Sequence, residues 1–401
     1  MSPSREAIRA YEQRVLTYDQ GRTRAAPRPP ARRRRPVRPV PLAVRVRRIT
    51  VLTSLLLLLI AFISLVGAVS KPSNVSFGVN FVEWLRNNGA AGLVSGVENI
   101  YYSLNAPSTG GAPLKRLPRV GAAARVQVAQ DAPGPIQPAI TPPLAGEGRW
   151  HRTGPLVGGV APLLVTTFRP DPNYPQLVAG VAWLDHTRTS IELYPGRYEP
   201  PNAGSQLAQV PDTLRSKLLA TFNSGFKLED TGGGGFYAGG HSYTPLKDGM
   251  ATLIGYTDGT VDVRNWTGGP DPGAGVVFAR QNLPLILSGG QLNPALSNDS
   301  LWGTTLGNAV RVWRSGIGVD AHGNLIYAAA DIQTAQSLAR VLQRAGAVRA
   351  MELDINYEWT TFNFFGGFGA AAPTKLLPGM DRPATRYLSP DDRDFFAVYA
   401  R

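Results

Sequence analysis

Three polar residues alternate with apolar ones over residues 351–356, late in the chain. Side chains of a strand point alternately to its two faces, so this pattern predicts a strand with Glu352, Asp354 and Asn356 on one face. Hydrolysis of a glycosidic bond uses two carboxyl groups, one beside an oxocarbenium-like transition state and one that activates water or donates a proton. Spacing alone is a weak signal, because carboxylates at strand ends also bond to solvent or to turn amides. Asp354 and Glu352 are therefore catalytic candidates.

The residues before this strand predict the elements that hold it. A turn at residues 320–324 is expected to join strands over residues 314–320 and 325–330 as a hairpin. Apolar residues then recur at helical spacing from Ile332 to Ala345, and Gly346 stands where a left-handed residue would end the helix. The candidate strand would thus follow directly on a helix that covers a sheet.

Two blocks of sequence resemble the phosphodiester glycosidase family. One is the Arg-x-Gly-Ile-Gly hairpin that begins at Arg314, with the helix and the strand end at Asp354 that follow it. The other is the Thr-Phe-Asn-Ser-Gly-Phe-Lys segment ending at Lys227, together with Pro-Leu-Lys-Asp-Gly at residues 245–249. The resemblance covers roughly residues 150–401 and implies an enzyme that hydrolyses a sugar-1-phosphodiester. Residues 355 and 356, Ile-Asn, stand where the family has two glycines.

The resemblance also implies roles for single residues. Asp354 matches the aspartate of the family motif, and Glu352 is supported less strongly. Arg314 would hold the phosphate, since a guanidinium can bind two phosphate oxygens at once. An ion pair on an edge strand is the alternative for Arg314. Asn223 would bind sugar hydroxyls or a catalytic water, unless it only supports a tight turn.

Lys227, Asn356 and His241 are further candidates for substrate contact. His241 lies just past four consecutive glycines, a run that lacks the Gly-Lys-Ser or Gly-Lys-Thr of a phosphate-binding loop and is more typical of a mobile loop beside a site. The chain has no cysteine, and no other histidine stands at ligand spacing. We therefore expect no disulfide, no metal and no cofactor. The aromatic residues at 359–365 could form core or stack on a sugar.

The first 48 residues differ in composition from the rest of the chain. They hold 14 arginines against three acidic residues, a net charge of +11 within +13 for the whole chain. A segment so rich in arginine and proline cannot offset its chain entropy by burial, so it is expected to be disordered. Nucleic acid is one possible partner for such a run, but the segment that follows favours anionic lipid.

A transmembrane helix is predicted over residues 49–70, because residues 49–69 carry no charge and can span a bilayer. The arginines before it place the N-terminus in the cytoplasm and the C-terminal domain outside. A buried core helix is one alternative. A cleaved signal peptide is another, although its apolar region is ordinarily only ~7 to 15 residues long.

Beyond the helix, residues 71–149 predict two short helices at 77–102 and a linker rich in proline, alanine and glycine, before a domain at 150–401. Strands are predicted over residues 163–168, 177–183, 190–194, 252–256, 260–263 and 283–287, and a helix over residues 211–219. The fold class is α+β, with a mixed, mostly antiparallel sheet and few helices.

The composition, with frequent Arg, Ala, Pro and Gly, is typical of a bacterium with a GC-rich genome. We expect a membrane-anchored extracytoplasmic hydrolase of glycosyl phosphodiesters in cell-envelope glycans. The alternative is a non-catalytic envelope protein that binds anionic glycans or scaffolds membrane partners, which Ile355 in place of a glycine motivates.

Overall fold

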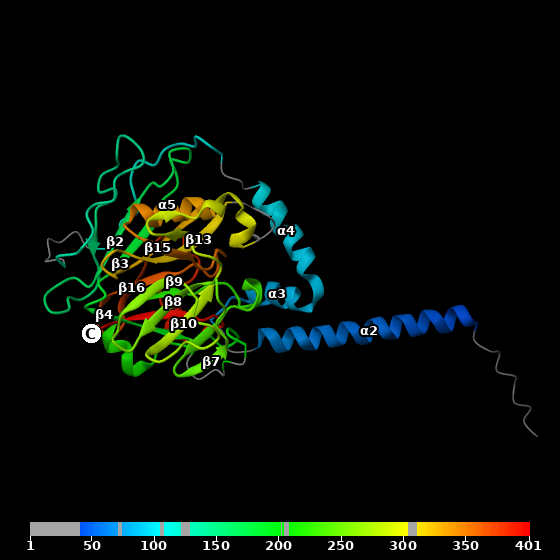
Figure 1. Cartoon of the computed structure of the whole chain (residues 1–401). Helices are drawn as coiled ribbons and strands as arrows, with labels where there is room; N and C mark the ends of the chain where they lie inside the picture. The colour runs from blue at the N-terminus through cyan, green and yellow to red at the C-terminus, as the bar shows by residue number, and fades with distance from the viewer. Residues whose placement is uncertain are drawn as a thin grey trace, which may run out of the picture. The chain divides into compact units, whose positions relative to one another are not determined.

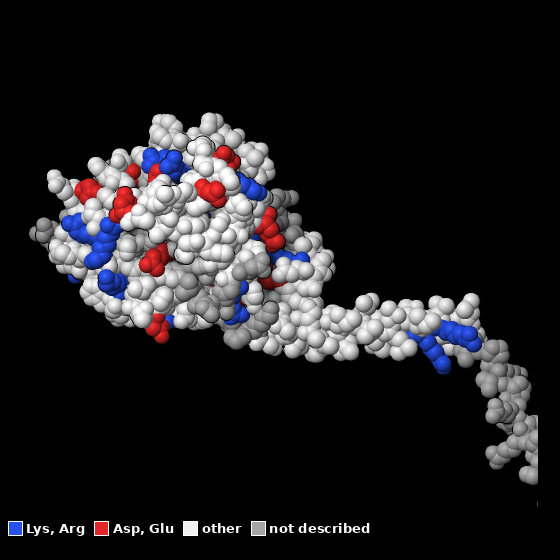
Figure 2. Space-filling view, turned by 60° about the horizontal axis from the view of Figure 1, so that its bottom comes forward, with Lys and Arg blue, Asp and Glu red and all other residues white. Residues whose placement is uncertain are grey.

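The computed structural model describes residues 41–70, 74–104, 108–121, 129–201, 203, 208–303 and 311–401. Most of the predicted basic tail therefore lies outside the described residues. The chain divides into two units, residues 1–63 and residues 64–401. Helix α2 (Leu42–Val69) has no buried residue and is long and apolar enough to cross a membrane. Basic residues lie at its N-terminal end, as Figure 2 shows in blue.

Three sheets build residues 150–401, and the strand pairs of the described residues are antiparallel, which confirms the predicted fold class. The first sheet contains, in order, β1 (His151–Arg152), β2 (Leu163–Phe168), β3 (Ala179–Leu184), β14 (Leu325–Gln333), β13 (Val312–Val319), β15 (Arg349–Glu352), β11 (Leu287–Ser288) and β12 (Gln291–Leu292). The second contains β7 (His241–Thr244), β6 (Phe236–Ala238), β10 (Val276–Asn282), β8 (Ala251–Tyr256) and β9 (Val261–Asn265). The third contains β17 (Ala371–Lys375), β16 (Phe362–Gly367), β5 (Leu218–Asn223), β18 (Phe395–Ala400) and β4 (Thr189–Tyr194).

The main core lies where the three sheets face one another, and it includes Phe222 of β5, Phe278 of β10 and Ile317 of β13. Helix α5 (Ala335–Arg344) lies over the first sheet in Figure 1. It packs on the other face of that sheet through Leu338 and Leu342. Both faces of the central strands β13 and β15 are therefore covered. This explains why apolar residues occupy both faces of these strands.

Helix α5 is shorter at its start than its apolar periodicity predicts. Thr334 and Ser337 form a reciprocal capping box that begins the helix at Ala335. Ile332 belongs to the end of β14 and has a φ of 59°. The predicted C-terminal end is confirmed, because Gly346 follows the last turn with a φ of 99°.

The structure differs from the sequence-based expectation in two other segments. The strand predicted over residues 283–287 is wrong except at its end, because Pro284 cannot donate to a strand ladder and its carbonyl accepts from the Trp302 indole. The helix predicted over residues 211–219 is a short 3-10 helix, η3 (Asp212–Lys217), after which β5 begins.

The two helices predicted after the apolar helix are present. They are α3 (Phe77–Leu85) and α4 (Ala91–Leu104), joined by the π-type turn η1 (Arg86–Ala90), where Gly89 takes a φ of 85°. Figure 1 shows both beside the sheets. Asn74, just before α3, bonds to Arg382 and to the Arg386 carbonyl, so this segment is attached to the folded domain.

Residues 129–149, which the composition suggests are part of a linker, pack on the first sheet. Ile136 is buried, and its N–H donates to the Gly148 carbonyl at 2.9 Å. Glu147 forms a buried ion pair of 2.8 Å with Arg169, directly after β2. A proline-rich composition does not prevent packing when a buried charge pair and backbone bonds hold the segment.

Candidate active site

Asp354 lies where the chain leaves the first sheet. Strand β15 ends at Glu352, although the alternating pattern predicts that it continues to Asn356. The Asp354 N–H donates to the Ser224 carbonyl after β5, and its carbonyl accepts from the Ser315 hydroxyl of β13 at 2.8 Å. Bonds to two different sheets therefore fix this backbone position.

A turn stabilised by its own side chains follows. Asp354 Oδ1 accepts from the Asn356 N–H, and Asn356 Oδ1 accepts from the Glu358 N–H, each at 2.9 Å. These are Asx turns, in which a side-chain oxygen replaces a backbone acceptor and bends the chain. They explain why the predicted strand ends early and why Asn356 does not share a strand face with Glu352.

The second oxygen of Asp354 is paired with Arg393. Arg393 Nη2 lies 2.9 Å from Asp354 Oδ2, and the two side chains are only 9% and 7% exposed. The same Nη2 donates to the Gly225 carbonyl, so the guanidinium is held in place. Burial raises the pKa of Asp354 above its ordinary value, and the positive charge of Arg393 opposes that rise.

Trp359 stands among three guanidinium groups. The distance from the guanidinium carbon Cζ to the centre of the Trp359 ring is 5.6 Å for Arg382, 5.1 Å for Arg386 and 5.4 Å for Arg393. All three are within reach of cation–π attraction. Arg386 is buried and is paired with Asp391 at 2.7 Å. The aromatic ring and the ion pairs together make a rigid base for Arg393.

Asp354 and Arg393 open onto a cavity of about 320 Å³, which we call the aspartate cavity. Its volume is in the range of about 300–1,000 Å³ that is typical of ligand sites. It is lined by Glu83, Arg86, Asn87, Ala91, Phe226, Lys227, Glu229, Asp230, Asp354, Ile355, Asn356, Trp359 and Arg393.

Two cationic side chains of the aspartate cavity come from well-separated parts of the chain. Lys227 follows β5, and its Nζ lies 2.6 Å from Glu83 Oε2 of helix α3. Burial raises the pKa of Glu83, but Lys227 outweighs it and leaves the pKa below the usual value. Arg86 of η1 also lines the cavity, so α3 and η1 form part of its wall.

The structure places Arg314 and Glu352 together, away from the aspartate cavity. Both are buried on the first sheet, where Arg314 Nη1 is paired with Glu352 Oε1. Arg314 also donates to the carbonyls of Gln333 and Trp302. Neither side chain is among the described residues that line the cavity. Arg393 therefore faces the cavity, and Arg314 does not.

Asn223 is buried between β5 and β13 and its amide is fully engaged. Its Nδ2 donates to the Ser224 carbonyl and the Ser315 hydroxyl, and its Oδ1 accepts from Tyr327 and the Thr361 N–H. Both donors and both acceptor sites are thus used inside the protein. We assign Asn223 to positioning the Asp354 turn through Ser224 and Ser315.

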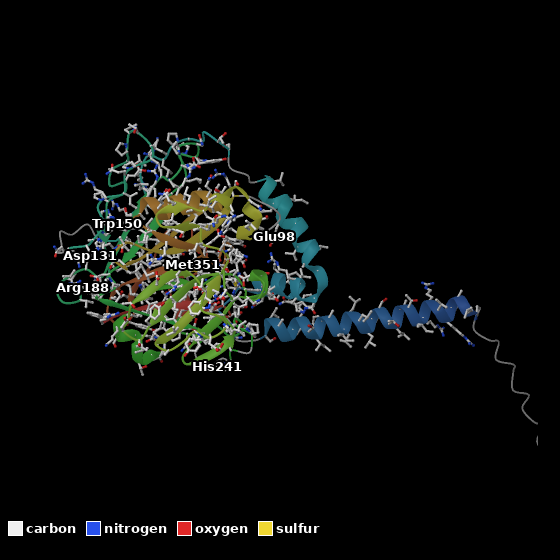
Figure 3. The ribbon with its side chains drawn as sticks, in the orientation of Figure 1. Glu98, Asp131, Trp150, Arg188, His241 and Met351 are labelled. Carbon is white, nitrogen blue, oxygen red and sulfur yellow. The ribbon has the colours of Figure 1, made fainter. Side chains whose placement is uncertain are left out.

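The other predicted residues divide into two groups. Lys227 and Asn356 line the aspartate cavity with Asp354. His241 is exposed on β7, where its ring packs edge-on against Tyr243 at 4.5 Å. Figure 3 shows His241 at the far edge of the domain from Met351 of β15. The fold does not bring His241 to the candidate site.

Arg393 and Glu83 were not predicted from the sequence. Arg393 belongs to the run Asp391-Asp392-Arg393-Asp394, in which each side chain is buried or nearly so. Such a charged run directly before the apolar strand β18 is a signal that could have been followed. Glu83 had no comparable signal, since it is one acidic residue on an otherwise apolar helix.

Residues 216–354 match the family model of the phosphodiester glycosidases, and this segment is therefore similar to that family. The matched residues include Lys227 and Asp354, which line the aspartate cavity, and end before Arg393. The structure groups no three metal-ligating side chains among the residues it describes.

The chain is also similar to several solved structures. The catalytic domain of zebrafish N-acetylglucosamine-1-phosphodiester alpha-N-acetylglucosaminidase, described as auto-inhibited by its pro-peptide, has 16% identity and a TM-score of 0.41, over 62% of this chain and 87% of that one. A hypothetical protein from Synechocystis has 13% identity and a TM-score of 0.35, over 62% and 64%. A putative exported protein from Burkholderia pseudomallei has 12% identity and a TM-score of 0.25, over 57% and 75%. None of the curated proteins matches the chain.

Proposed function

We propose that this protein hydrolyses glycosyl phosphodiesters, with the reaction taking place in the aspartate cavity. The observation that carries the proposal is the buried Asp354–Arg393 pair at the wall of a ligand-sized cavity, in a chain that matches the phosphodiester glycosidase family model. The cavity presents both signs of charge that the reaction requires, a carboxylate for the sugar and cations for the phosphate.

The substrate phosphate would bind Arg393 and Lys227. A guanidinium binds phosphate oxygens as a pair, and an ammonium acts as a compact point charge. Lys227 now bonds to Glu83, so substrate must exchange that carboxylate for a phosphate oxygen. Both cations line the same cavity as Asp354, so a phosphate bound to them would lie next to the reacting sugar carbon.

Asp354 would stabilise the positive charge that develops on the sugar ring. The bond between the anomeric carbon and the phosphate oxygen breaks, water supplies the new oxygen, and the products are a free sugar and a phosphate monoester. A phosphate monoester leaves more readily than a sugar alkoxide, so the reaction depends less on a general acid than ordinary glycoside hydrolysis. One carboxylate suffices in this scheme, and Glu352 serves to hold Arg314.

Helix α2 would anchor the enzyme in the membrane, with the arginines on the cytoplasmic side in contact with anionic lipid heads. The domain would then act outside the cytoplasm on sugar-phosphate material of the cell envelope. The length and apolar composition of α2 support a membrane span, and the arginines before it support this orientation.

A direct test uses the full chain in detergent with a panel of sugar-1-phosphodiesters and teichoic-type polymers. Release of free sugar and phosphate monoester is followed by mass spectrometry, with Asp354→Asn as the control. We expect the wild type to release both products and Asp354→Asn to release neither. Absence of released sugar from the whole panel would refute the proposal.

The alternative is a protein that binds anionic glycans without cleaving them. Ile355 favours it to a limited extent, because its side chain lines the cavity and packs with Phe226 and Val312. Tight glycan binding by the wild type, unchanged in Asp354→Asn and without turnover, would support this function.

A further inference from the structure

A second cavity of about 400 Å³ adjoins the aspartate cavity, and we call it the helix-side cavity. The two share Glu83, Asn87, Lys227, Glu229, Trp359 and Arg393 in their linings. The surface of the helix-side cavity is more apolar than polar, whereas that of the aspartate cavity is evenly divided between polar and apolar atoms. A ligand that enters both cavities would thus have a charged part and an apolar part.

The helix-side cavity extends to the last turn of α2. Ala68 of that turn lines it, together with Val75, Trp84, Tyr198 and Pro201. The Trp84 indole donates to the Ser64 hydroxyl at 3.0 Å, which links α3 to the end of α2. Ser64 and Ala68 belong to the same structural unit as the catalytic domain.

Chain length keeps this region close to the bilayer if α2 spans it. Seven residues, 70–76, separate the end of α2 from the start of α3. At most ~3.6 Å per residue, they can bridge no more than about 25 Å. Val75 and Val79 then pack on Trp359, a residue of both cavities. The candidate site is therefore connected to the membrane surface by one short, attached segment.

These observations lead to an inference about the substrate, which rests on the proposed function. We propose that the substrate is a lipid-linked glycosyl phosphodiester, in which the alcohol esterified to the phosphate carries a long apolar chain. The sugar and the phosphate occupy the aspartate cavity, and the first carbons of the chain lie in the helix-side cavity against Trp84 and Val75. Hydrolysis at the anomeric carbon then releases the sugar and leaves the lipid phosphate in the membrane.

The test is a series of substrates that differ only in the alcohol. The methyl, butyl and octyl phosphodiesters of a sugar that the wild type hydrolyses are assayed with the full chain in detergent. Each buried methylene contributes about 0.8 kcal/mol, so kcat/KM is expected to rise at least about tenfold from methyl to octyl. Trp84→Ala should reduce this octyl-to-methyl ratio by at least about threefold, since the indole forms part of the cavity.

Phe368→Ala is the matched control. Phe368 is an exposed aromatic residue, 53% accessible, in the turn between β16 and β17, outside both cavities, so its removal should leave the ratio unchanged. Detergent binds the octyl chain to the same extent whichever variant is assayed. A difference in the octyl-to-methyl ratio of kcat/KM between variants therefore reports on the cavity.

The outcomes separate this inference from the proposed function. Hydrolysis of the methyl ester with no gain from the longer chains would overturn the lipid-linked substrate and leave the enzyme function standing. A gain that persists unchanged in Trp84→Ala would also overturn it, since the chain would then be bound elsewhere. Hydrolysis of none of the phosphodiesters would refute the proposed function, and this inference with it.

Discussion

Replacing Arg393 by glutamine tests the central ion pair of the candidate site. The substitution keeps much of the side-chain volume and removes the charge that faces Asp354. Because the carboxylate stays buried and, among the described residues, keeps only the Asn356 N–H as a hydrogen-bond donor, its ionised form loses its main source of stabilisation. We therefore expect a loss of folding stability that depends on whether Asp354 is ionised.

The magnitude follows from the burial of the pair. Arg393 and Asp354 are 2.9 Å apart, with side chains 9% and 7% exposed. Removing one partner of such a pair destabilises a protein by about 3–5 kcal/mol, because it leaves an uncompensated charge. One backbone N–H continues to stabilise the carboxylate, so we expect about 3 kcal/mol in the free energy of unfolding at pH 8.

The pH dependence has a definite sign. Burial already raises the pKa of Asp354, and removing the positive charge raises it further. Below this raised pKa the buried group is neutral and no longer requires a cation. The stability lost in Arg393→Gln should therefore be largest at high pH and should decrease as the pH falls.

Chemical denaturation of the full chain in detergent, followed by tryptophan fluorescence at pH 5 and pH 8, measures this difference. The double variant Arg393→Gln with Asp354→Asn should recover much of the loss at pH 8, because neither charge remains. Arg349→Gln is a control at a 39% exposed arginine paired with Asp262, and it should cost less than about 1 kcal/mol. An equal loss at both pH values, without recovery in the double variant, would refute the reasoning.

Three further predictions concern the same domain. Asp354→Asn should lower kcat by about 10²- to 10⁴-fold with little change in KM. If steady-state kinetics show full kcat, Asp354 takes no part in the reaction. Arg314→Met should cost about 3 kcal/mol of stability because it removes the cation paired with the buried Glu352, while the folded fraction keeps wild-type kinetics. A selective rise in KM for phosphodiesters would instead show that Arg314 contacts the substrate. In a pH–rate profile, kcat/KM should rise through an acidic limb with a pKa above the ordinary ~3.9 of an aspartate, because the reaction uses ionised Asp354 and burial raises its pKa; a limb at the ordinary value would contradict this.

Local patterns predicted much of the domain correctly. Strand β2 has the predicted bounds, and the strands predicted over residues 252–256 and 260–263 correspond to β8 and β9, which a turn with Gly259 at a φ of 83° joins. These features depend on neighbours in sequence, such as alternation, turn residues and a glycine with a left-handed conformation. The same reasoning placed a helix of membrane-spanning length at the N-terminal end.

Patterns of this kind also made Asp354 a candidate, but they could not decide what surrounds it. Arg314 and Glu352 stand near Asp354 in the chain or on neighbouring strands, yet they pair with each other in the interior. Both faces of β13 and β15 are buried because α5 covers the second face, and the alternation of a single strand does not reveal such a partner.

The sequence by itself determined which residues could do chemistry and where the chain turns, because both follow from side-chain type and near neighbours. Only the tertiary structure decided which of them meet. Arg393 is 39 residues from Asp354, and Glu83 is 144 residues from Lys227. Contacts over such separations arise from the packing of three sheets and an N-terminal helix, and no local periodicity encodes them.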